Sequence, residues 1–313
     1  MTSVSFLTSL KRATIFVNPA AGNGRSVPVG AEVQKVFAEA FCPADLVTPP
    51  SASEMEAAVR EAIASGSRLL IALGGDGTLQ TLVNAAYGQD VVLGILPGGG
   101  GNDFAAALGL PADPLAAAKV LASGGEPRCI DLARARTADR HERLYVGGGG
   151  VGIDAEAARH AVGRWRRLPG RSRYIVAALQ ALCTYQPIAV QVEFSSGNQP
   201  PLETKALLAA ALNTPSYGGG IRLAPEARLD DGLLDVVVVE TAGLAEALTW
   251  IPELLRSGEL RRARVRRMRA SELKLVTSRE CLFHGDGEIL GPAPVEIEVL
   301  PRAARILVPG QAS

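Results

Sequence analysis

The sequence predicts an α/β domain with a parallel sheet, followed by a domain of antiparallel β-structure. The chain has 313 residues, which at roughly 150 residues per domain indicates about two domains. Over the first 135 or so residues, short apolar runs alternate with helical patterns, which is typical of a doubly wound parallel sheet covered on both faces. After about residue 140, strand-like runs follow one another with turns between them, which is typical of antiparallel sheets.

In the first half, uninterrupted apolar runs predict strands at 14–17, 69–73, 91–96 and 129–132. Ser53 and Glu56 form a capping-box pattern that predicts a helix ending at Gly66. Asp113, followed by proline, predicts another helix that ends at Gly124. In the second half, strands are predicted at 144–146, 188–194, 206–212, 233–240, 273–276, 281–284, 295–300 and 306–308. Helices are predicted only near 174–182 and 244–255.

Composition excludes several classes of protein. The 32 basic and 32 acidic residues give zero net charge, which argues against a general nucleic-acid binder. The four cysteines form no CxxC pair, which argues against a zinc ribbon and favours reduced thiols in the cytoplasm. The N-terminus lacks a basic start and a sustained apolar run, and the longest uncharged stretch contains Pro187. We therefore expect no signal peptide and no membrane span.

The predicted strand 69–73 runs directly into Gly74, Gly75, Asp76, Gly77 and Thr78, after which a helical pattern begins. A strand, a glycine-rich turn and a helix N-terminus together favour anion binding, because backbone N–H groups and the helix dipole attract phosphate. The alternative is a structural turn in which Asp76 is an N-cap. Since a carboxylate would repel phosphate, Asp76 would bind ribose, contact a metal or position the turn.

A second glycine-rich turn follows strand 91–96 and contains four consecutive glycines, at 98–101. Such a run is entropically unfavourable, and a ligand lying against the backbone is one reason to tolerate it; a loosely held loop is the alternative. A third loop, at 18–25, follows the first strand. Because ligands of doubly wound sheets bind beyond the carboxyl ends of the strands, all three loops are expected at one edge.

The run 147–152 matches GxGxxG but lies in the β-rich half, and no acidic residue ends a second strand about 20 residues later. This disfavours an NAD-dependent dehydrogenase.

Seven segments, in order along nearly the whole chain, resemble the diacylglycerol kinase catalytic-domain family, which includes bacterial lipid kinases and sphingosine kinases. They are NPAAG at 18–22, GGDGT at 74–78, PGGGGND at 97–103, ID at 130–131, GVGIDA at 150–155, GGG through P to DGLLD at 218–235, and DGE at 286–288. The chain departs from the family pattern at three positions: Gly100 replaces a threonine, Ala106 an arginine and Gly147 an asparagine.

The resemblance implies a nucleotide-binding domain at 1–135, completed by about 296–313, and a lipid-binding domain at 136–295. It implies ATP and Mg²⁺ as cofactors, a catalytic base at Asp286 or Glu288, and a substrate contact at Asp154. The implied metal site is Asp231 with backbone oxygens at Arg228 and Leu233. The implied nucleotide contacts are Asn18, Thr48, Gly74, Gly75, Asp76, Gly77, Thr78, Gly99, Gly100, Asn102 and Asp103.

The residues themselves leave alternatives open. Phosphoryl transfer needs charge neutralisation, alignment and a base for the attacking hydroxyl. Asp286 and Glu288 flank one glycine, which is also the pattern of an ordinary Asp-Gly hairpin turn. Asp231 precedes a glycine in the same way, although it also suits a hard cation. For Asp154, a helix N-cap is the alternative.

Two arginine-rich segments, at 164–173 and 260–269, are either solvated faces or contacts with an anionic membrane.

We therefore predict a cytoplasmic, ATP- and Mg²⁺-dependent lipid kinase that associates peripherally with membranes and serves phospholipid biosynthesis. Its substrate would be a hydroxyl of a diacylglycerol-like or long-chain-base lipid. The alternatives are a NAD kinase-like enzyme, which shares the GGDGT turn, and a catalytically silent lipid- or nucleotide-binding protein. A homodimer is left open.

Overall fold

The computed structural model describes residues 12–24, 26–40, 43–153, 187–195, 199–240, 246, 249–250, 253, 256–259 and 264–310. The chain divides into two compact units, Met1–Ile130 with Arg302–Ser313, and Asp131–Pro301. Two strands, β5 (Glu126–Arg136) and β15 (Val295–Val308), carry the chain from one unit into the other. The first unit is α/β and the second is antiparallel β, so the predicted fold class is confirmed.

The first unit is built on a parallel sheet in the order β4-β3-β1-β2, with the end of β15 beside β4. Its strands are β1 (Ala13–Val17), β2 (Ala44–Val47), β3 (Leu69–Gly74) and β4 (Val92–Pro97). Every residue of β1, β3 and β4 is buried. This burial explains their almost entirely apolar sequences, because helices cover both faces of the sheet.

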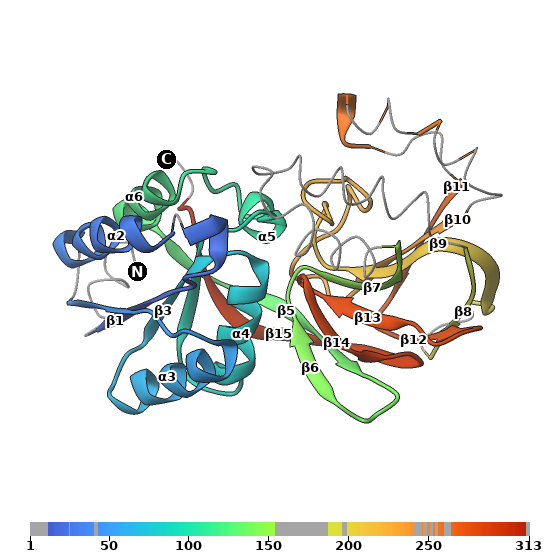
Figure 1. Cartoon of the computed structure of the whole chain (residues 1–313), viewed down its shortest axis with the longest axis horizontal. Helices are drawn as coiled ribbons and strands as arrows, with labels where there is room; N and C mark the ends of the chain where they lie inside the picture. The colour runs from blue at the N-terminus through green and yellow to red at the C-terminus, as the bar shows by residue number, and fades with distance from the viewer. Residues whose placement is uncertain are drawn as a thin grey trace. The chain divides into compact units, whose positions relative to one another are not determined.

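Helices α2 (Ser26–Ala40) and α6 (Pro114–Gly124) pack together on one face of this sheet, and α3 (Ala52–Ala64) and α4 (Asp76–Ala86) on the other (Figure 1). The predicted cap of α6 is confirmed, because Asp113 Oδ2 accepts from the Ala116 N–H at 2.7 Å. The predicted cap of α3 is wrong by two residues. The N-cap is Ser51, whose Oγ accepts from the Glu54 N–H at 3.2 Å. The capping residues are therefore Ser51 and Glu54 and not Ser53 and Glu56.

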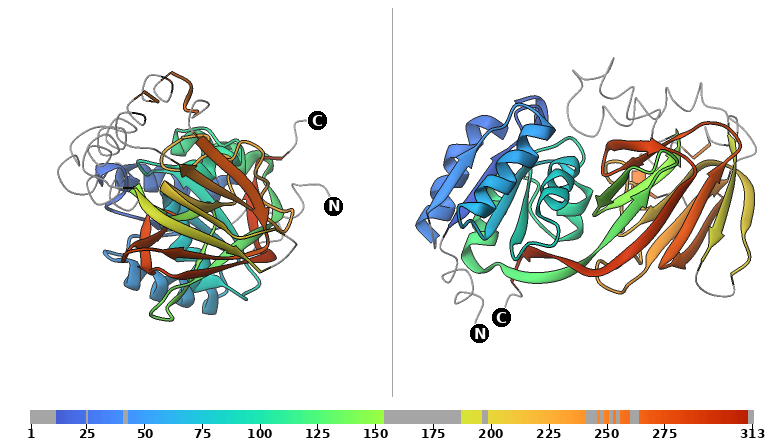
Figure 2. Two further views of the ribbon diagram at one scale, coloured as in Figure 1. Left: turned by 90° about the vertical axis from the view of Figure 1, so that its right-hand side faces the viewer. Right: turned by 90° about the horizontal axis from the view of Figure 1, so that it is seen from below.

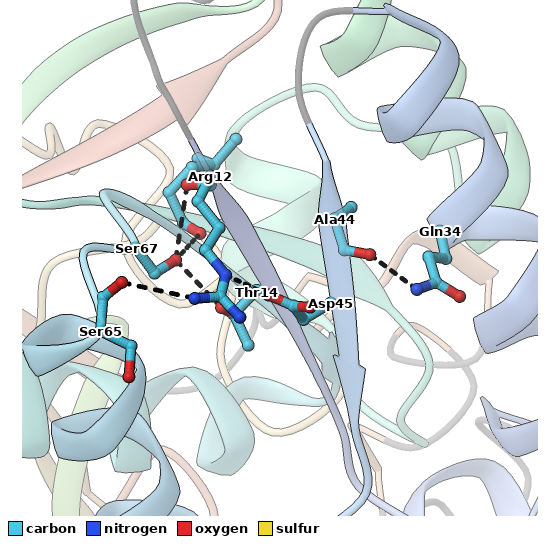
Figure 3. A network of polar contacts seen from close by, with 8 residues as sticks. Arg12, Thr14, Gln34, Ala44, Asp45, Ser65 and Ser67 are labelled. Carbon is cyan, nitrogen blue, oxygen red and sulfur yellow. Dashed lines mark hydrogen bonds and ion pairs between the residues drawn. The ribbon is translucent and has the colours of Figure 1, made fainter.

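Polar contacts tie together the amino edge of the parallel sheet (Figure 3). The Arg12 guanidinium pairs with Asp45, which follows the first residue of β2, at 2.5 Å. Thr14 Oγ1 donates to Ser67 Oγ at 3.0 Å between buried side chains. These contacts fix the start of β1 relative to β2 and to the residues that lead into β3, and they leave the carboxyl edge to the glycine-rich loops.

The second unit contains antiparallel strands, which run side by side in Figure 2. They are β6 (Glu142–Tyr145), β7 (Gly148–Gly152), β8 (Ile188–Phe194), β9 (Leu202–Leu212), β10 (Leu234–Glu240), β11 (Arg264–Ala270), β12 (Glu272–Thr277), β13 (Leu282–Gly285) and β14 (Glu288–Pro292). Alternate residues of β10 enter different apolar clusters: Val236 belongs to one and Val237 to the other. The strand β10 therefore packs against apolar side chains on both of its faces.

The structure differs from the sequence prediction at several strands. The strands β2, β7, β11 and β14 are absent from the predicted set, and β15 is one strand rather than two. The GxGxxG run forms β7, which pairs antiparallel with β9 and β13. A Cβ at Gly149 would lie 2.5 Å from the Phe283 ring, so close packing explains this glycine. The helix predicted at 174–182, and most of that at 244–255, lie outside the described residues.

Candidate active site

Three loops meet at the carboxyl edge of the parallel sheet, as predicted. Asn18, which follows β1, donates from Nδ2 to Thr78 Oγ1 at 3.0 Å, and its backbone N–H donates to the Leu73 carbonyl at 3.1 Å. Thr48 follows β2 at the same edge and is exposed. The loop after β1 is thus joined to the turn after β3.

The two glycine-rich loops pack backbone against backbone. The Gly98 N–H donates to the Gly74 carbonyl at 2.8 Å. A Cβ at Gly99 would lie 2.6 Å from the Cα of Gly75, and a Cβ at Gly98 would lie 2.6 Å from Ser26 Oγ. The loop after β4 is therefore held in place rather than loose, and contact between the loops is itself a reason for glycine at these positions.

Asp76 caps a helix other than its own. Its carboxylate accepts from the Asp103 N–H at 3.0 Å and the Phe104 N–H at 3.2 Å, at the start of α5 (Asp103–Ala107). Within the same loop, Asn102 Oδ1 accepts from the Gly99 N–H at 3.0 Å. Of the roles open to Asp76, these contacts support positioning, because they couple the two glycine-rich loops.

The geometry of these loops suits a phosphate group. Gly75 is the N-cap of α4 and, as a glycine, has no side chain that could cap this helix end. The turn residues Gly75, Gly77 and Gly100 are half-buried, so a ligand can reach their backbone. Backbone N–H groups and the dipole of a helix N-terminus favour an anion at such a place.

In the second unit, Asp286 and Gly287 form the turn between β13 and β14. Both have left-handed backbone conformations, with φ of 49° and 89°, as expected for Asp-Gly in a tight hairpin. Asp286 is 8% exposed. Its carboxylate accepts from the backbone N–H groups of Val146, Gly147 and Gly148 at 2.7, 2.8 and 3.1 Å. Asp286 is thus a clamp between this hairpin and the residues before β7.

Glu288, the other predicted catalytic carboxylate, is exposed at the start of β14. Partial loss of hydration raises the pKa of Glu288, and the positive charges of His284 and Arg143 oppose this rise. An accessible carboxylate with a raised pKa is suited to accept a proton near neutral pH. The contacts therefore separate the two candidates: Asp286 is engaged by the backbone, and Glu288 faces solvent.

Sequence reasoning missed the residues that support this hairpin clamp. Asn213 Nδ2 donates to the Val146 carbonyl at 3.1 Å, and Thr214 Oγ1 donates to the Gly147 carbonyl at 3.1 Å. Tyr145 is fully buried and donates to the Ala211 carbonyl at 3.2 Å. Burial, together with the nearby Asp286 charge, raises the pKa of Tyr145 well above its ordinary value. The position of Asn213 and Thr214 directly after an apolar strand was the one available signal.

The Asp231 turn makes contacts of a different kind. Asp231 Oδ1 accepts from the Leu233 N–H at 3.2 Å, and its other carboxylate oxygen pairs with Arg269. Asp131 Oδ2 accepts from the Gly232 N–H at 2.6 Å. Among the described residues, no group of three or more His, Cys, Asp or Glu side chains is placed to hold a metal ion. The magnesium site at Asp231, Arg228 and Leu233 stays a prediction.

Asp154 and the arginines of 164–173 lie outside the described residues. In the second basic segment, Arg264 pairs with Glu246, Arg266 with Glu240 and Arg269 with Asp231, and Arg267 donates to the Leu223 carbonyl. These internal contacts favour a structural role for the described part of that segment. Within the described part of the chain, no helix is both long enough and apolar enough to span a membrane.

Comparison with known proteins identifies the family. Residues 12–135 match the diacylglycerol kinase catalytic domain, and residues 149–308 match the YegS C-terminal NAD kinase β-sandwich-like domain. A diacylglycerol kinase of Mycobacterium tuberculosis is 28% identical over 302 residues, covering 95% of each chain. A YegS-like lipid kinase of Stenotrophomonas maltophilia is 30% identical over 269 residues, covering 82% of this chain and 84% of that protein.

The fold has solved counterparts. A crystal structure of a diacylglycerol kinase from Bacillus anthracis superimposes with a TM-score of 0.71 at 22% identity, covering 96% of this chain and 98% of that one. An α/β domain with this catalytic-domain signature, followed by this β-sandwich, defines a class of two-domain kinases. The chain belongs to the diacylglycerol kinase and YegS-like lipid kinase family.

Proposed function

We propose that the protein transfers the γ-phosphate of ATP to a hydroxyl of a diacylglycerol-like or long-chain-base lipid. The observation that carries this proposal is the difference in contacts between the two carboxylates of the DGE hairpin. Asp286 is held by three backbone N–H groups, whereas the neighbouring Glu288 presents an exposed carboxylate of raised pKa. General base catalysis needs a positioned carboxylate that can reach the hydroxyl, and an accessible Glu288 on a firmly held turn is suited to this role.

The nucleotide would bind the first domain, residues 1–135 completed by about 296–313. The backbone of the loops at 74–78 and 97–103 would contact the phosphates, with Asn18 and Thr48 at the same edge. Asp76 would hold the two loops in register through the α5 N-terminus. Mg²⁺ would arrive bound to ATP and neutralise charge on its phosphates.

The lipid would bind the second domain, residues 136–295. Glu288 would accept the proton of the attacking hydroxyl as the oxygen bonds to the γ-phosphorus, and ADP would leave. Asp286 would act as a positioning residue, because its contacts hold the hairpin on which Glu288 lies. The substrate class is supported by the relatives named diacylglycerol kinase and lipid kinase.

A NAD kinase-like activity is the second candidate, since the matched C-terminal domain is described as NAD kinase β-sandwich-like. It differs in the acceptor, a soluble nucleotide hydroxyl rather than a lipid hydroxyl.

The test is transfer of radiolabelled γ-phosphate from MgATP to diacylglycerol, sphingosine, ceramide and monoacylglycerol in mixed micelles. We expect a labelled lipid with the wild type and at least a hundredfold lower kcat with Glu288→Gln, in line with the typical contribution of about 10²–10⁴ from general base catalysis. Glu280→Gln, which alters an exposed glutamate beside the same hairpin, should retain wild-type activity. Equal activity of Glu288→Gln and the wild type would refute the assignment of the base.

A further inference from the structure

The turn at Asp231, Gly232 and Leu233 contains an ion pair that bears on the metal expected there. Arg269 of β11 pairs with Asp231, and its Nε lies 3.7 Å from Asp235 Oδ2. Arg269 is also the direct cross-strand partner of Asp235 in the β10–β11 pairing. One guanidinium therefore serves two carboxylates, one on the turn and one on the strand that follows it.

The burial of Asp235 makes this contact important for stability. The Asp235 side chain is only 7% exposed, compared with 43% for Arg269. Burial raises the pKa of Asp235, and the charge of Arg269 opposes that rise. An ionised carboxylate at such a depth needs a nearby cation, and Arg269 is placed to provide it. Arg267, two residues earlier on the strand, donates to the Leu223 carbonyl at 2.7 Å and so helps to anchor this part of β11.

The Arg269 ion pair at this turn competes with a magnesium ion for Asp231. Both Asp231 oxygens already have partners, the Leu233 N–H and the Arg269 guanidinium. A divalent cation bound to Asp231 would also face the like charge of Arg269.

We propose that the Arg269 guanidinium takes the place of a structural metal ion at this turn, so that the second domain is stable without Mg²⁺. The proposal is independent of the kinase activity. It implies that any Mg²⁺ requirement in catalysis comes from ATP and not from the fold of the second domain.

Thermal unfolding of the full-length protein without ATP, in EDTA and in excess MgCl₂, tests the proposal. We expect the wild type to have the same Tm in both conditions. Arg269→Gln should lower the Tm in EDTA by about 2–4 °C, a shift that corresponds to about 1 kcal/mol for domains of this size. It should also recover stability on addition of Mg²⁺, because Asp231 and Asp235 then lack a cation. Arg269→Lys, which keeps the charge, should show no Mg²⁺ response and a Tm close to that of the wild type.

Arg266→Gln is the matched control, because Arg266 lies on the same strand but pairs with Glu240. It should acquire no Mg²⁺ response. Three results would overturn the proposal. The first is that Mg²⁺ raises the Tm of the wild type and that this rise is lost in Asp231→Asn. The others are an Arg269→Gln Tm equal to that of the wild type, and an Arg269→Gln protein whose Tm does not rise with Mg²⁺. All of these are read from Tm, so they are separate from failure to phosphorylate a lipid.

Discussion

Asp76 couples the two glycine-rich loops, and replacing it with alanine should separate loop positioning from simple helix capping. The half-buried carboxylate accepts two backbone hydrogen bonds, at 3.0 and 3.2 Å. Net contributions of roughly 1 kcal/mol for each such bond give a loss of about 2 kcal/mol for Asp76→Ala. For a unit of this size, the Tm should fall by about 4–8 °C.

The loops should also shift relative to each other, because Gly99 and Gly75 are in backbone contact and depend on the Asp76 cap for their register. We expect the KM for ATP to rise about tenfold, equivalent to about 1.4 kcal/mol of lost binding, with a smaller change in kcat. The assay is steady-state phosphate transfer at a temperature well below the variant's Tm.

Asp113→Ala is the matched control. Asp113 caps α6 through one N–H at 2.7 Å, so its loss should cost about 1 kcal/mol and leave the KM for ATP unchanged. If Asp76→Ala raises the KM for ATP no more than Asp113→Ala does, Asp76 does not position the loops for the nucleotide. Asp76→Asn keeps one acceptor oxygen and should be intermediate. A folded Asp76→Asn protein with no activity would instead indicate that the charge acts directly on the nucleotide.

The loops and the hairpin also determine how stability and activity respond to substitution and pH. Gly99→Ala places a Cβ 2.6 Å from the Gly75 Cα and should lower the free energy of unfolding by about 1–3 kcal/mol. In the control Gly124→Ala, the new Cβ meets nothing within 4 Å, and the free energy of unfolding should change by less than about 0.5 kcal/mol. Urea unfolding measures both, and similar values for the two variants would contradict close packing at Gly99. Asp286→Asn replaces an acceptor oxygen with a donor facing backbone N–H groups and should cost about 2 kcal/mol in the same experiment; an unchanged midpoint would show that Asp286 is not a clamp. Because the folded-state pKa of Glu288 is raised, its ionisation destabilises the folded state as the pH rises through that pKa. Glu288→Gln should therefore be slightly more stable than the wild type at neutral pH. Below the unfolded-state pKa of about 4.3, the two proteins should be equally stable. In the wild type, the acid limb of kcat/KM should lie above the ordinary glutamate pKa; a limb at the ordinary value would argue against Glu288 as the base.

The fold was predictable where local pattern reflects burial. The strands β1, β3 and β4 lie beneath helices on both faces, so their sequences are almost entirely apolar. The strand β7 carries four glycines, and β11 carries four arginines with its side chains mostly exposed. Neither has the apolar alternation that identifies a strand, because β7 is selected for close backbone packing and β11 for ion pairs.

The candidate site was predictable as a set of residues but not as a set of contacts. The positions of Asp76 and Asp286 in glycine-rich turns marked both as polar residues of interest. Their partners, however, lie 27 and 28 residues away for Asp76 and 138 to 140 residues away for Asp286. No local spacing encodes a hydrogen bond of that separation. The sequence therefore left Asp286 and Glu288 as equivalent candidates, and the backbone donors around Asp286 distinguish them.

The most direct test of lipid phosphorylation is a competition between diacylglycerol and NAD as acceptors. The wild-type protein is combined with MgATP labelled in the γ-phosphate, diacylglycerol in mixed micelles, and NAD. The label is then followed into the organic and aqueous phases. We predict label in a lipid product in the organic phase, and none in a phosphorylated NAD. Label on NAD would contradict lipid phosphorylation. ATP binding without a labelled product from any lipid tested in place of diacylglycerol would contradict it as well.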